Sequence, residues 1–455
     1  MQESPKNKPG PSGVTEPGKK EAHTGEALKA KGYKFRDQRR RYPWWVKSVE
    51  RMTTETDDTI ARQPGLPIVA EVWFFKGREE YQALVAKGQA KARENIINKV
   101  PGCRIQDLSL IFASGTYFPG GYTWDGNYYD GIEKVSKIVS VQVHPPDKLG
   151  VPRWEGTDAE ASEMVEAAAI HLGALQVGYA AVNPLWLSTM ARFDPVAEKI
   201  KTTAEGLTII PERFKYVVVM AVPVPQAAAR RATSFIGGAA NRVGFEGYIA
   251  VRERVKNFIR GIGYGVMELP INDNAIPFAV MAGLGEMGRM NRMISPIYGG
   301  ALCVSALITD LPLALDKPID FGLQEFCKRC KICARVCPAS AISREDDPSW
   351  TPGDEYGVPG KKVWFEYGSR CHTYCVQAAH FCGACMYSCC WTKENTWFHN
   401  LMRVIGSNMP LASGLMAHFE KAFRFGIVPP EKREDWWKMK LPNRGINSFN
   451  VRRAM

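Results

Sequence analysis

The cysteines of this chain form two closely spaced groups. The first reads Cys327-Lys-Arg-Cys330-Lys-Ile-Cys333-Ala-Arg-Val-Cys337-Pro338 and matches the pattern C-x2-C-x2-C-x3-C-P. These short spacings wrap three thiolates round one face of an iron–sulfur cubane and send the fourth to a second cluster. A zinc site normally uses paired C-x2-C arms with a longer gap between them. The motif therefore predicts [4Fe-4S] clusters, whose chemistry is single-electron transfer.

A second group supplies the thiolates that two clusters require. It reads C-x10-C-x2-C-x3-C over Cys371, Cys382, Cys385 and Cys389. The crossed rule of two-cluster ferredoxins exchanges the fourth cysteine of each motif. We therefore predict two ligand sets, which are Cys327, Cys330, Cys333 and Cys389 for one cluster, and Cys382, Cys385, Cys337 and Cys371 for the other.

Four cysteines are not needed by these sets. Cys375 and Cys390 lie inside the second group, and the choice between Cys371 and Cys375 as a ligand stays open. Cys103 and Cys303 lie far away in the sequence, so we expect them to be small buried apolar residues. Two clusters form a path for electrons but make no bonds themselves, so a catalytic cofactor is expected elsewhere.

The rest of the chain has the composition of a folded protein. Its 455 residues are 45% hydrophobic, with a net charge of +12, and the length predicts two or three domains of about 150 residues. The longest apolar runs, 216–223 and 301–308, are far shorter than the roughly 18 to 20 residues that cross a bilayer. The basic, Pro- and Gly-rich residues 1–30 are expected to lack structure of their own. The composition excludes a collagen, a coiled coil and a disordered protein.

Apolar stretches alternate with helical periodicity after residue 65. We predict strands at 67–75, 135–143, 215–222 and 301–308, and helices at 81–100, 159–175 and 245–262. The second of these helices should carry Met164, Ala168 and Leu172 on one face. The order predicts an α/β (α+β) fold, and the cysteine motifs after Pro318 mark a second domain.

A glycine motif lies between these regions. Gly283-Leu-Gly285-Glu-Met-Gly288 fits G-x-G-x-x-G, but residues 277–282 before it make a poor strand, so dinucleotide binding is not favoured. The glycines let the backbone approach a large planar ligand, or they form a tight turn. The chain also lacks D-x-H-x-x-G, the cobalt-ligating histidine motif of the methyltransferase type.

An ordered series of segments from about residue 215 to 405 resembles the corrinoid-dependent reductive dehalogenases. The segments are Phe258-Ile-Arg260 with Gly263-Tyr264, Ile271-Asn272-Asp273, Ala282 to Arg289, Ile294 to Gly299, Thr309 to Leu313, Lys317 to Gly322 and the cysteine motifs. The resemblance implies a nitroreductase-like core that holds a base-off corrinoid, joined to a ferredoxin-like domain with two [4Fe-4S] clusters. It implies four domain ranges, which are a basic lead 1–42, a core 43–315, a cluster domain 316–405 and a C-terminal segment 406–455 that packs back on the core.

The resemblance also implies a reaction and its residues. An organohalide takes up two electrons and a proton and releases halide, with the corrinoid cobalt providing the difficult chemistry. The family's proton donor is a tyrosine, which Tyr248 resembles in the pair Gly247-Tyr248, although counting back from Phe258 reaches Phe245 instead. Asn272 matches the supporting asparagine, and Arg289, with Arg292 as an alternative, is the candidate for the basic residue. The residues assigned to the corrinoid are Gly283, Gly285, Gly288 and Ser295.

Aromatic residues are the candidates for the substrate pocket. Phe118, Trp124 and Trp44 would provide an apolar slot for a small halogenated hydrocarbon. We favour a chlorinated alkane over an alkene because the pattern departs from the chloroethene-reducing and aryl-halide members.

Partners and location also follow from the resemblance. Respiratory members carry a twin-arginine (Tat) export signal, and the chain begins after the place where that signal would end. We therefore expect peripheral attachment to the outer face of the cytoplasmic membrane, a small integral-membrane anchor protein and a quinone-linked electron donor chain. No nucleic acid partner is expected.

Two other functions compete with this interpretation. An epoxyqueuosine reductase would use the same cofactors on tRNA, and the +12 charge would suit that substrate. A ferredoxin-type electron carrier would need only the cysteine motifs, and would leave some 300 residues without a task. A corrinoid absorption band in the purified protein separates the carrier from both enzymes.

Overall fold

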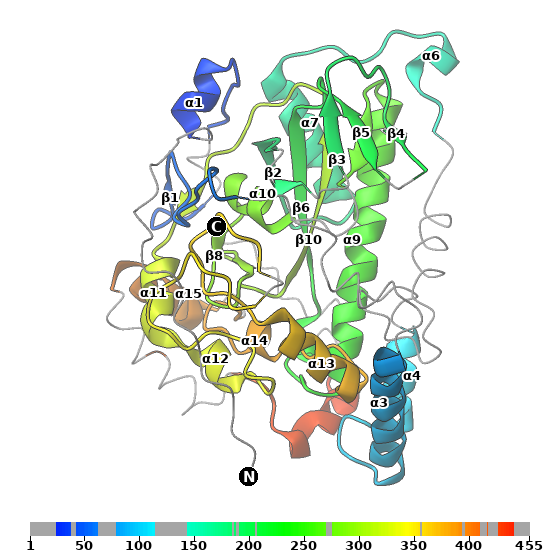
Figure 1. The fold of residues 1–455 in the computed structure, drawn as a ribbon, viewed down its shortest axis with the longest axis vertical. Helices are drawn as coiled ribbons and strands as arrows, with labels where there is room; N and C mark the ends of the chain where they lie inside the picture. Colours follow the sequence, from blue (N-terminus) through cyan, green and yellow to red (C-terminus); the bar gives the residue numbers. More distant parts are fainter. Residues whose placement is uncertain are drawn as a thin grey trace.

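A four-stranded antiparallel sheet forms the centre of the fold. The computed structural model describes residues 24–37, 42–61, 79–113, 143–183, 186–187, 191–204, 207–269, 275–354, 357–393, 396–409, 416 and 426–440. The strand order is β2 (Gln176–Ala181), β6 (Tyr216–Pro223), β10 (Leu302–Thr309) and β7 (Val266–Glu268), and each neighbouring pair is antiparallel. The predicted strands at 215–222 and 301–308 are confirmed as β6 and β10, which pair along their whole lengths from Tyr216–Thr309 to Pro223–Leu302. In Figure 1 the sheet lies in the upper half of the molecule with α9 beside it.

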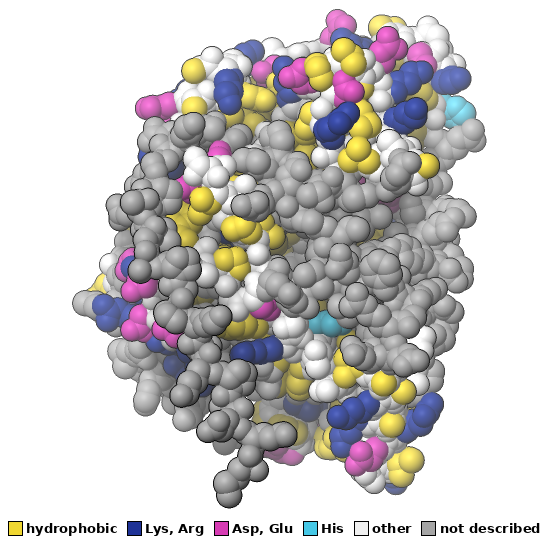
Figure 2. Space-filling model, viewed as in Figure 1, with side chains coloured by type: hydrophobic (Ala, Val, Ile, Leu, Met, Phe, Trp, Pro, Cys, Tyr) yellow, Lys and Arg dark blue, Asp and Glu magenta, His cyan; other side chains and the backbone are white. Residues whose placement is uncertain are grey.

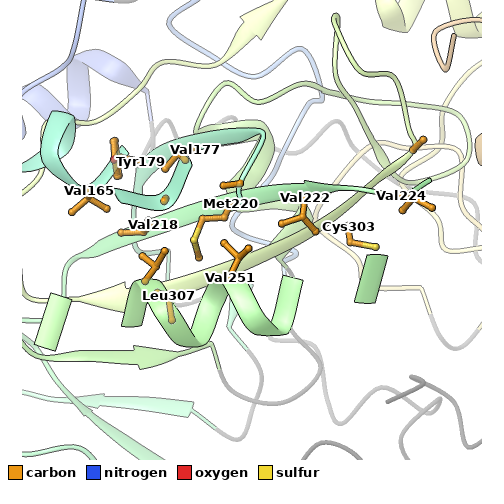
Figure 3. Packing of buried hydrophobic residues seen from close by; sticks show 14 of the residues in the cluster. Val165, Val177, Tyr179, Val218, Met220, Val222, Val224, Val251, Cys303 and Leu307 are labelled. Carbon is orange, nitrogen blue, oxygen red and sulfur yellow. The ribbon is translucent and has the colours of Figure 1, made fainter. Parts of the chain in front are cut away.

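Both faces of the sheet are covered because β6 is apolar on both sides. Val218, Met220 and Val222 face α7 (Asp158–His171) and α9 (Phe235–Gly261) in one core cluster, as Figure 3 shows. Val217 and Val219 belong to a second cluster with α10 (Ala275–Met281). Continuous apolar strands of this kind are typical of a sheet buried between helices. The mixed α/β class predicted from the sequence is confirmed.

The predicted helices exist, with differences in detail. α3 (Glu79–Ile97), α7 and α9 correspond to the predicted helices at 81–100, 159–175 and 245–262. In α7 the fully buried residues include Ala161, Val165 and Ala169, while Met164, Ala168 and Leu172 of the predicted face are half-buried. α9 begins ten residues earlier than predicted, at Phe235. Its first turns are rich in glycine and alanine, which pack closely without giving an apolar period.

The N-terminal segment contains a short helix that the sequence did not predict. α1 (Gly25–Ala30) is capped by the Thr24 side chain and buries Leu28. It is held from outside, since the amide of Gly25 donates to the carbonyl of Glu50 at 3.1 Å. Part of the stretch 1–30 is therefore ordered by contacts with the core. The predicted strands at 67–75 and 135–143 lie almost wholly outside the described residues.

The cysteine region forms a helical unit against the lower end of the core (Figure 1). Its helices are α11 (Leu323–Cys330), α12 (Ile332–Val336), α13 (Gly368–Ala378), α14 (Ala384–Tyr387) and α15 (Trp397–Asn408). Near the N-terminus, β1 (Lys47–Ser48) pairs with β11 (Ile319–Asp320), and Trp45 packs on Phe321 and Trp391. The residues before the core and the cysteine region thus share one apolar cluster.

The remaining elements cover the edges. They are α4 (Ile105–Ala113), α6 (Pro146–Leu149), α8 (Gln226–Ala229), the hairpin β8 (Glu286–Met287) with β9 (Met293–Ile294), the small sheet β3 (Ala191–Asp194), β5 (Thr208–Pro211) and β4 (Lys201–Thr202), and the 3-10 helix η3 (Pro430–Lys438). η3 lies against the α8–α9 turn, where Arg433 donates to the carbonyls of Ala232 and Thr233. Among the described helices, none combines the length and the apolar character that crossing a membrane requires. Figure 2 shows Lys and Arg side chains over the upper part and the lower right corner of one face, with others along its left edge and near its centre.

Candidate functional site

The first thiol group combines residues of both cysteine motifs. Cys327, Cys330 and Cys333 lie on α11 and α12, which meet at Lys331 with a positive φ of 50°. Burial raises the pKa of Cys327 and Cys333, and the thiols of Cys330 and Cys389 raise it further in both cases. Cys389 of the second motif therefore lies with the first three cysteines of the first motif. The surplus Cys390 lies beside this group, with its Sγ 3.9 Å from Sγ of Cys330.

The second thiol group contains the reciprocal exchange. Burial raises the pKa of Cys382, and the neighbouring Cys375, Cys385 and Cys337 thiols add to the shift. Burial also raises the pKa of Cys385 to about 12, with Glu366 and Cys337 as further causes. Cys337 of the first motif therefore lies with Cys382 and Cys385. This is the grouping that a crossed pair of clusters needs, while ligation itself stays a prediction.

The choice between Cys371 and Cys375 stays open in the structure. A hydrogen bond with Cys375 is the largest cause that raises the pKa of Cys371, and Cys385 contributes as well. The Cys375 thiol also raises the pKa of Cys382. Both thiols therefore lie beside the second group.

The surroundings of the sulfurs fit iron–sulfur clusters. The amide of Ala341 donates to Sγ of Cys337 at 3.2 Å, and the amide of Ala384 donates to Sγ of Cys382 at 3.5 Å. Such amides stabilise sulfur that carries negative charge. In the described part of the chain no three ligand side chains converge as they would on one metal ion. A cubane takes each thiolate on a different iron, so its ligands are spread over a wider volume.

Arg289 lies against the first thiol group. Its guanidinium donates to the carbonyl of Cys327 at 2.8 and 3.0 Å and to those of Ser343 and Glu345 at 3.0 and 2.6 Å. It also stacks on Trp364, 4.6 Å from the ring centre. Burial lowers the pKa of Arg289, and the nearby cysteines partly offset this. These contacts show that Arg289 stabilises the loops that carry the cysteines. Among the described residues no contact joins Arg289 to Tyr248, so its predicted part in the proton transfer stays a prediction.

Arg292, the alternative basic residue, lies near the second thiol group. It pairs with Glu366 at 2.7 Å. That carboxylate raises the pKa of Arg292 further, as do Cys385 and Cys371. Each of the two candidate arginines therefore accompanies one thiol group.

The glycine motif leads into the β8–β9 hairpin and contains its first strand. It follows helix α10, whereas a dinucleotide-binding motif follows a strand. Gly283 has a positive φ of 66°, and a Cβ on Gly285 would collide with the carbonyl of Ile294. The hairpin accounts for these glycines as a tight turn. Ser295 is fully buried at its end, and its hydroxyl accepts from the amides of Ile297 and Tyr298; the assignment of the four residues to a corrinoid stays a prediction.

Glu286, inside this motif, is a buried carboxyl that connects three segments. It accepts from the Thr53 hydroxyl at 2.6 Å and from the amides of Phe321 and Leu323 at 2.7 and 3.3 Å. Burial is the largest cause that raises its pKa, to about 7. An acid whose pKa is higher in the folded state contributes stability that is fully present below its unfolded pKa, near 4.5, and is lost as the pH rises through 7.

We therefore expect Glu286→Gln to flatten the pH dependence of stability between about pH 4.5 and 7. The wild-type free energy of unfolding should fall by about 3 kcal/mol more than that of the variant over this range. The amide can keep all three hydrogen bonds, because its nitrogen can donate to Thr53. The measurement is the thermal unfolding midpoint of anaerobically assembled protein at each pH, with the exposed Glu94→Gln as control. Parallel curves for wild type and Glu286→Gln would refute the titration of this carboxyl.

Tyr248 lies half-buried on α9. Its ring packs edge-on against Phe245, with ring centres 5.8 Å apart. The guanidinium of Arg252 lies 5.9 Å from the Tyr248 ring centre. The sequence analysis missed Arg252, although a residue four positions along a helix shares its face with Tyr248. Arg252 in turn pairs with Glu268 at 2.6 Å.

Two charged partners complete this group on α9. Lys256 lies 2.5 Å from both Glu253 and Glu268. Glu253 is fully buried, and burial with the nearby Glu268 raises its pKa. The Tyr248 side of α9 thus carries a compact network of charges.

A second buried pair was also missed. The Tyr387 hydroxyl donates to Oδ1 of Asn241 at 2.6 Å. Tyr387 lies between the second thiol group and α9. The thiols of Cys303, Cys385 and Cys382 all raise the pKa of its hydroxyl. Asn241 lies in the middle of the small-residue part of α9, which a helix tolerates when the side chain has a partner. Cys103 and Cys303 are buried apolar residues, as predicted.

Three predicted site residues lie outside the described residues, namely Asn272, Phe118 and Trp124. Trp44 is 79% exposed, whereas its neighbour Trp45 is buried. Trp44 therefore lines no closed slot within the described part of the chain.

Comparisons with known proteins give consistent matches. The family model described as reductive dehalogenase subunit matches residues 40–191 and 192–313, which is more than half of the chain. A trichloroethene reductive dehalogenase of Dehalococcoides mccartyi is 28% identical over 345 residues, covering 65% of this chain. A tetrachloroethene reductive dehalogenase of Sulfurospirillum multivorans is 26% identical over 432 residues, covering 88% of this chain and 83% of that protein. The chain spans 60% of the length of the trichloroethene relative.

A solved structure has the same fold. The catabolic reductive dehalogenase NpRdhA superposes with a TM-score of 0.59 at 21% identity, and the match covers 85% of this chain and 50% of that one. At this identity the likeness concerns the arrangement of helices and strands.

Proposed function

This chain belongs to the reductive dehalogenase family, and on that premise we propose that it replaces a carbon-bound halogen by hydrogen. The reaction consumes two electrons and one proton. The carbon–halogen bond breaks, a carbon–hydrogen bond forms, and halide leaves. The observation that carries the proposal furthest is the exchange of Cys389 and Cys337 between the two thiol groups. Two adjacent clusters would deliver the electrons one at a time to a reacting centre.

The proposal includes a base-off corrinoid in a nitroreductase-like core. When bound, its cobalt would supply the chemistry of carbon–halogen cleavage. Family membership supports this cofactor, as does the absence of D-x-H-x-x-G from the sequence. The β8–β9 glycines pack on their own hairpin, so they do not by themselves form a cradle for it.

The proton is assigned to the hydroxyl of Tyr248. A phenol can act as a general acid when a nearby cation stabilises the anion that remains. The guanidinium of Arg252 lies 5.9 Å from the centre of this ring. We propose Arg252, instead of Arg289, as the basic residue that supports Tyr248.

The substrate class in this proposal is a small chlorinated alkane. The curated relatives are named for chloroethenes, and the alkane preference depends on the sequence pattern alone. The expected setting is the outer face of the cytoplasmic membrane, with a small membrane anchor protein and a quinone-linked donor chain.

The test is an anaerobic assay of cofactor-loaded protein with reduced viologen. Halide release would be followed on chloroform, trichloroethane, tetrachloroethene and a chlorophenol while the corrinoid spectrum is recorded. Faster turnover of the two alkanes supports the proposed reaction and the alkane preference. Turnover of the chlorophenol alone contradicts the alkane preference. A correctly assembled protein that binds no corrinoid contradicts the reaction itself.

A further inference from the structure

A small cavity lies where the N-terminal segment meets a loop of the cysteine region. Its volume is about 30 Å³. The walls come from Met52, Trp186 and Val358, with Pro277 and Val280 of α10. The cavity is held together by the backbone, since the amide of Asp57 donates to Gly360 at 2.9 Å and that of Lys362 to Glu55 at 2.9 Å. Gly360 has a positive φ of 96°, and a Cβ there would collide with Ala61.

Two polar residues line this apolar cavity without a side-chain partner among the described residues. Thr54 is 6% exposed, and its hydroxyl makes no hydrogen bond there. Lys361 lines the same cavity and is half-buried, and among the described residues its ammonium forms no ion pair. A buried polar group without a partner is unfavourable, and a half-buried charge loses part of its hydration. Both groups can donate, so together they call for an acceptor.

The charges around Lys361 define the sign of that acceptor. The guanidinium of Arg292 lies near Lys361 and lowers the pKa of the Lys361 amine. Arg292 itself pairs with Glu366. The nearby Asp57 carboxylate accepts from the amide and hydroxyl of Thr59 at 2.8 and 2.5 Å. Burial and Arg292 lower the pKa of Lys361 to about 8, so the amine is mostly protonated at neutral pH. A bound anion would relieve the excess of positive charge.

We infer that Lys361 and Thr54 form a binding site for a halide ion. The volume has room for a single ion or about two waters, and a phosphate or an organic acid would have to displace the walls. Large halides are weakly hydrated, so apolar walls cost them less than they cost other anions. This inference rests on the proposed function in one respect, because the proposed reaction releases halide and so makes this ion the product.

The test uses bromide as the probe and the cofactor-loaded enzyme. Anaerobic crystals soaked in bromide should show an anomalous peak within hydrogen-bond distance of Nζ of Lys361 and Oγ1 of Thr54. The peak should vanish in Lys361→Met and weaken in Thr54→Val. Lys362→Met is the matched control, because the neighbouring Lys362 pairs with Glu55 at 2.9 Å outside the cavity. No peak in the wild type, or an equal peak in Lys361→Met, overturns the site.

A solution measurement excludes binding at crystal concentration only. Replacing gluconate by bromide at constant ionic strength should raise the unfolding midpoint of the wild type and of Lys362→Met by a few degrees, and should not raise that of Lys361→Met. Equal shifts in all three proteins overturn the site.

Neither measurement involves an organohalide. If the wild-type protein binds no bromide but still dehalogenates its substrate, the halide site is refuted and the proposed function is not. Bromide binding in a protein that dehalogenates no substrate refutes the proposed function alone.

Discussion

A Cys389→Ser substitution is expected to remove the same cluster as Cys327→Ser, although the two cysteines belong to different motifs. The reason is that the Cys389 thiol lies beside Cys327 and Cys333 and contributes to the raised pKa of both. Viologen-driven halide release should fall to background, since one gap interrupts the path of electrons. Iron content should fall by about half, and the electron paramagnetic resonance signal of one reduced cluster should disappear in both variants.

The reciprocal pair extends this test. Cys337→Ser and Cys382→Ser should both lose the paramagnetic resonance signal of the second cluster. The reason is that the Cys337 thiol lies near Cys382 and contributes to its raised pKa. Cys390→Ser is the matched control, as it replaces the thiol next to Cys389 and should keep both signals. If Cys389→Ser instead loses the signal that Cys382→Ser loses, the crossed arrangement is wrong. Comparing Cys371→Ser with Cys375→Ser in the same way identifies the fourth ligand of the second cluster.

Tyr248→Phe is expected to lower kcat by about 10²- to 10⁴-fold, the usual range for the loss of a general acid. Phenylalanine keeps the edge-on packing with Phe245 and removes only the hydroxyl. Both cluster signals and the corrinoid spectrum should be unchanged. The measurement is steady-state halide release, together with the solvent deuterium isotope effect on kcat.

The control for this prediction is Tyr264→Phe. Tyr264 lies just after α9 and donates to the carbonyl of Trp154 at 3.1 Å. It should keep most of the activity. Arg252→Gln should reduce kcat with little change in KM if Arg252 stabilises the tyrosine anion. A Tyr248→Phe variant with near wild-type activity would remove Tyr248 from the mechanism and leave the position of Phe245 as the point of comparison with the family.

The central sheet could be predicted because its strands are unusually uniform. β6 and β10 are long apolar runs, and burial on both faces removes the ambiguity that polar residues introduce. The beginning of α9 could not be predicted, because Gly237, Gly238, Ala239 and Ala240 pack by their small size and leave no periodic signal. The short strands β3, β4 and β5 also carry too few residues for a pattern.

The candidate site divides in the same way. The two thiol groups could be predicted from the cysteine spacing, because three ligands of each cluster come from one short motif and the fourth comes from the other motif by the crossed rule. The task of Arg289 could not be predicted, since its partners are backbone carbonyls at residues such as Cys327 and Ser343, whose side chains do not matter for the contact. Lys361 and Thr54 share a cavity only after folding brings segments some 300 residues apart together.

The pairing of β1 with β11 has a consequence for how the protein is made. Lys47 lies opposite Asp320, so this contact closes a loop of more than 270 residues. A contact between such distant positions forms late, because the chain entropy of closing the loop must be overcome first. On the ribosome, Trp45 cannot contact Phe321 and Trp391 until the residues up to Trp391 have emerged. Because Trp391 follows Cys390 directly, we expect the cysteine loops to reach their final positions, and the clusters to be completed, only after both distant segments are available to each other.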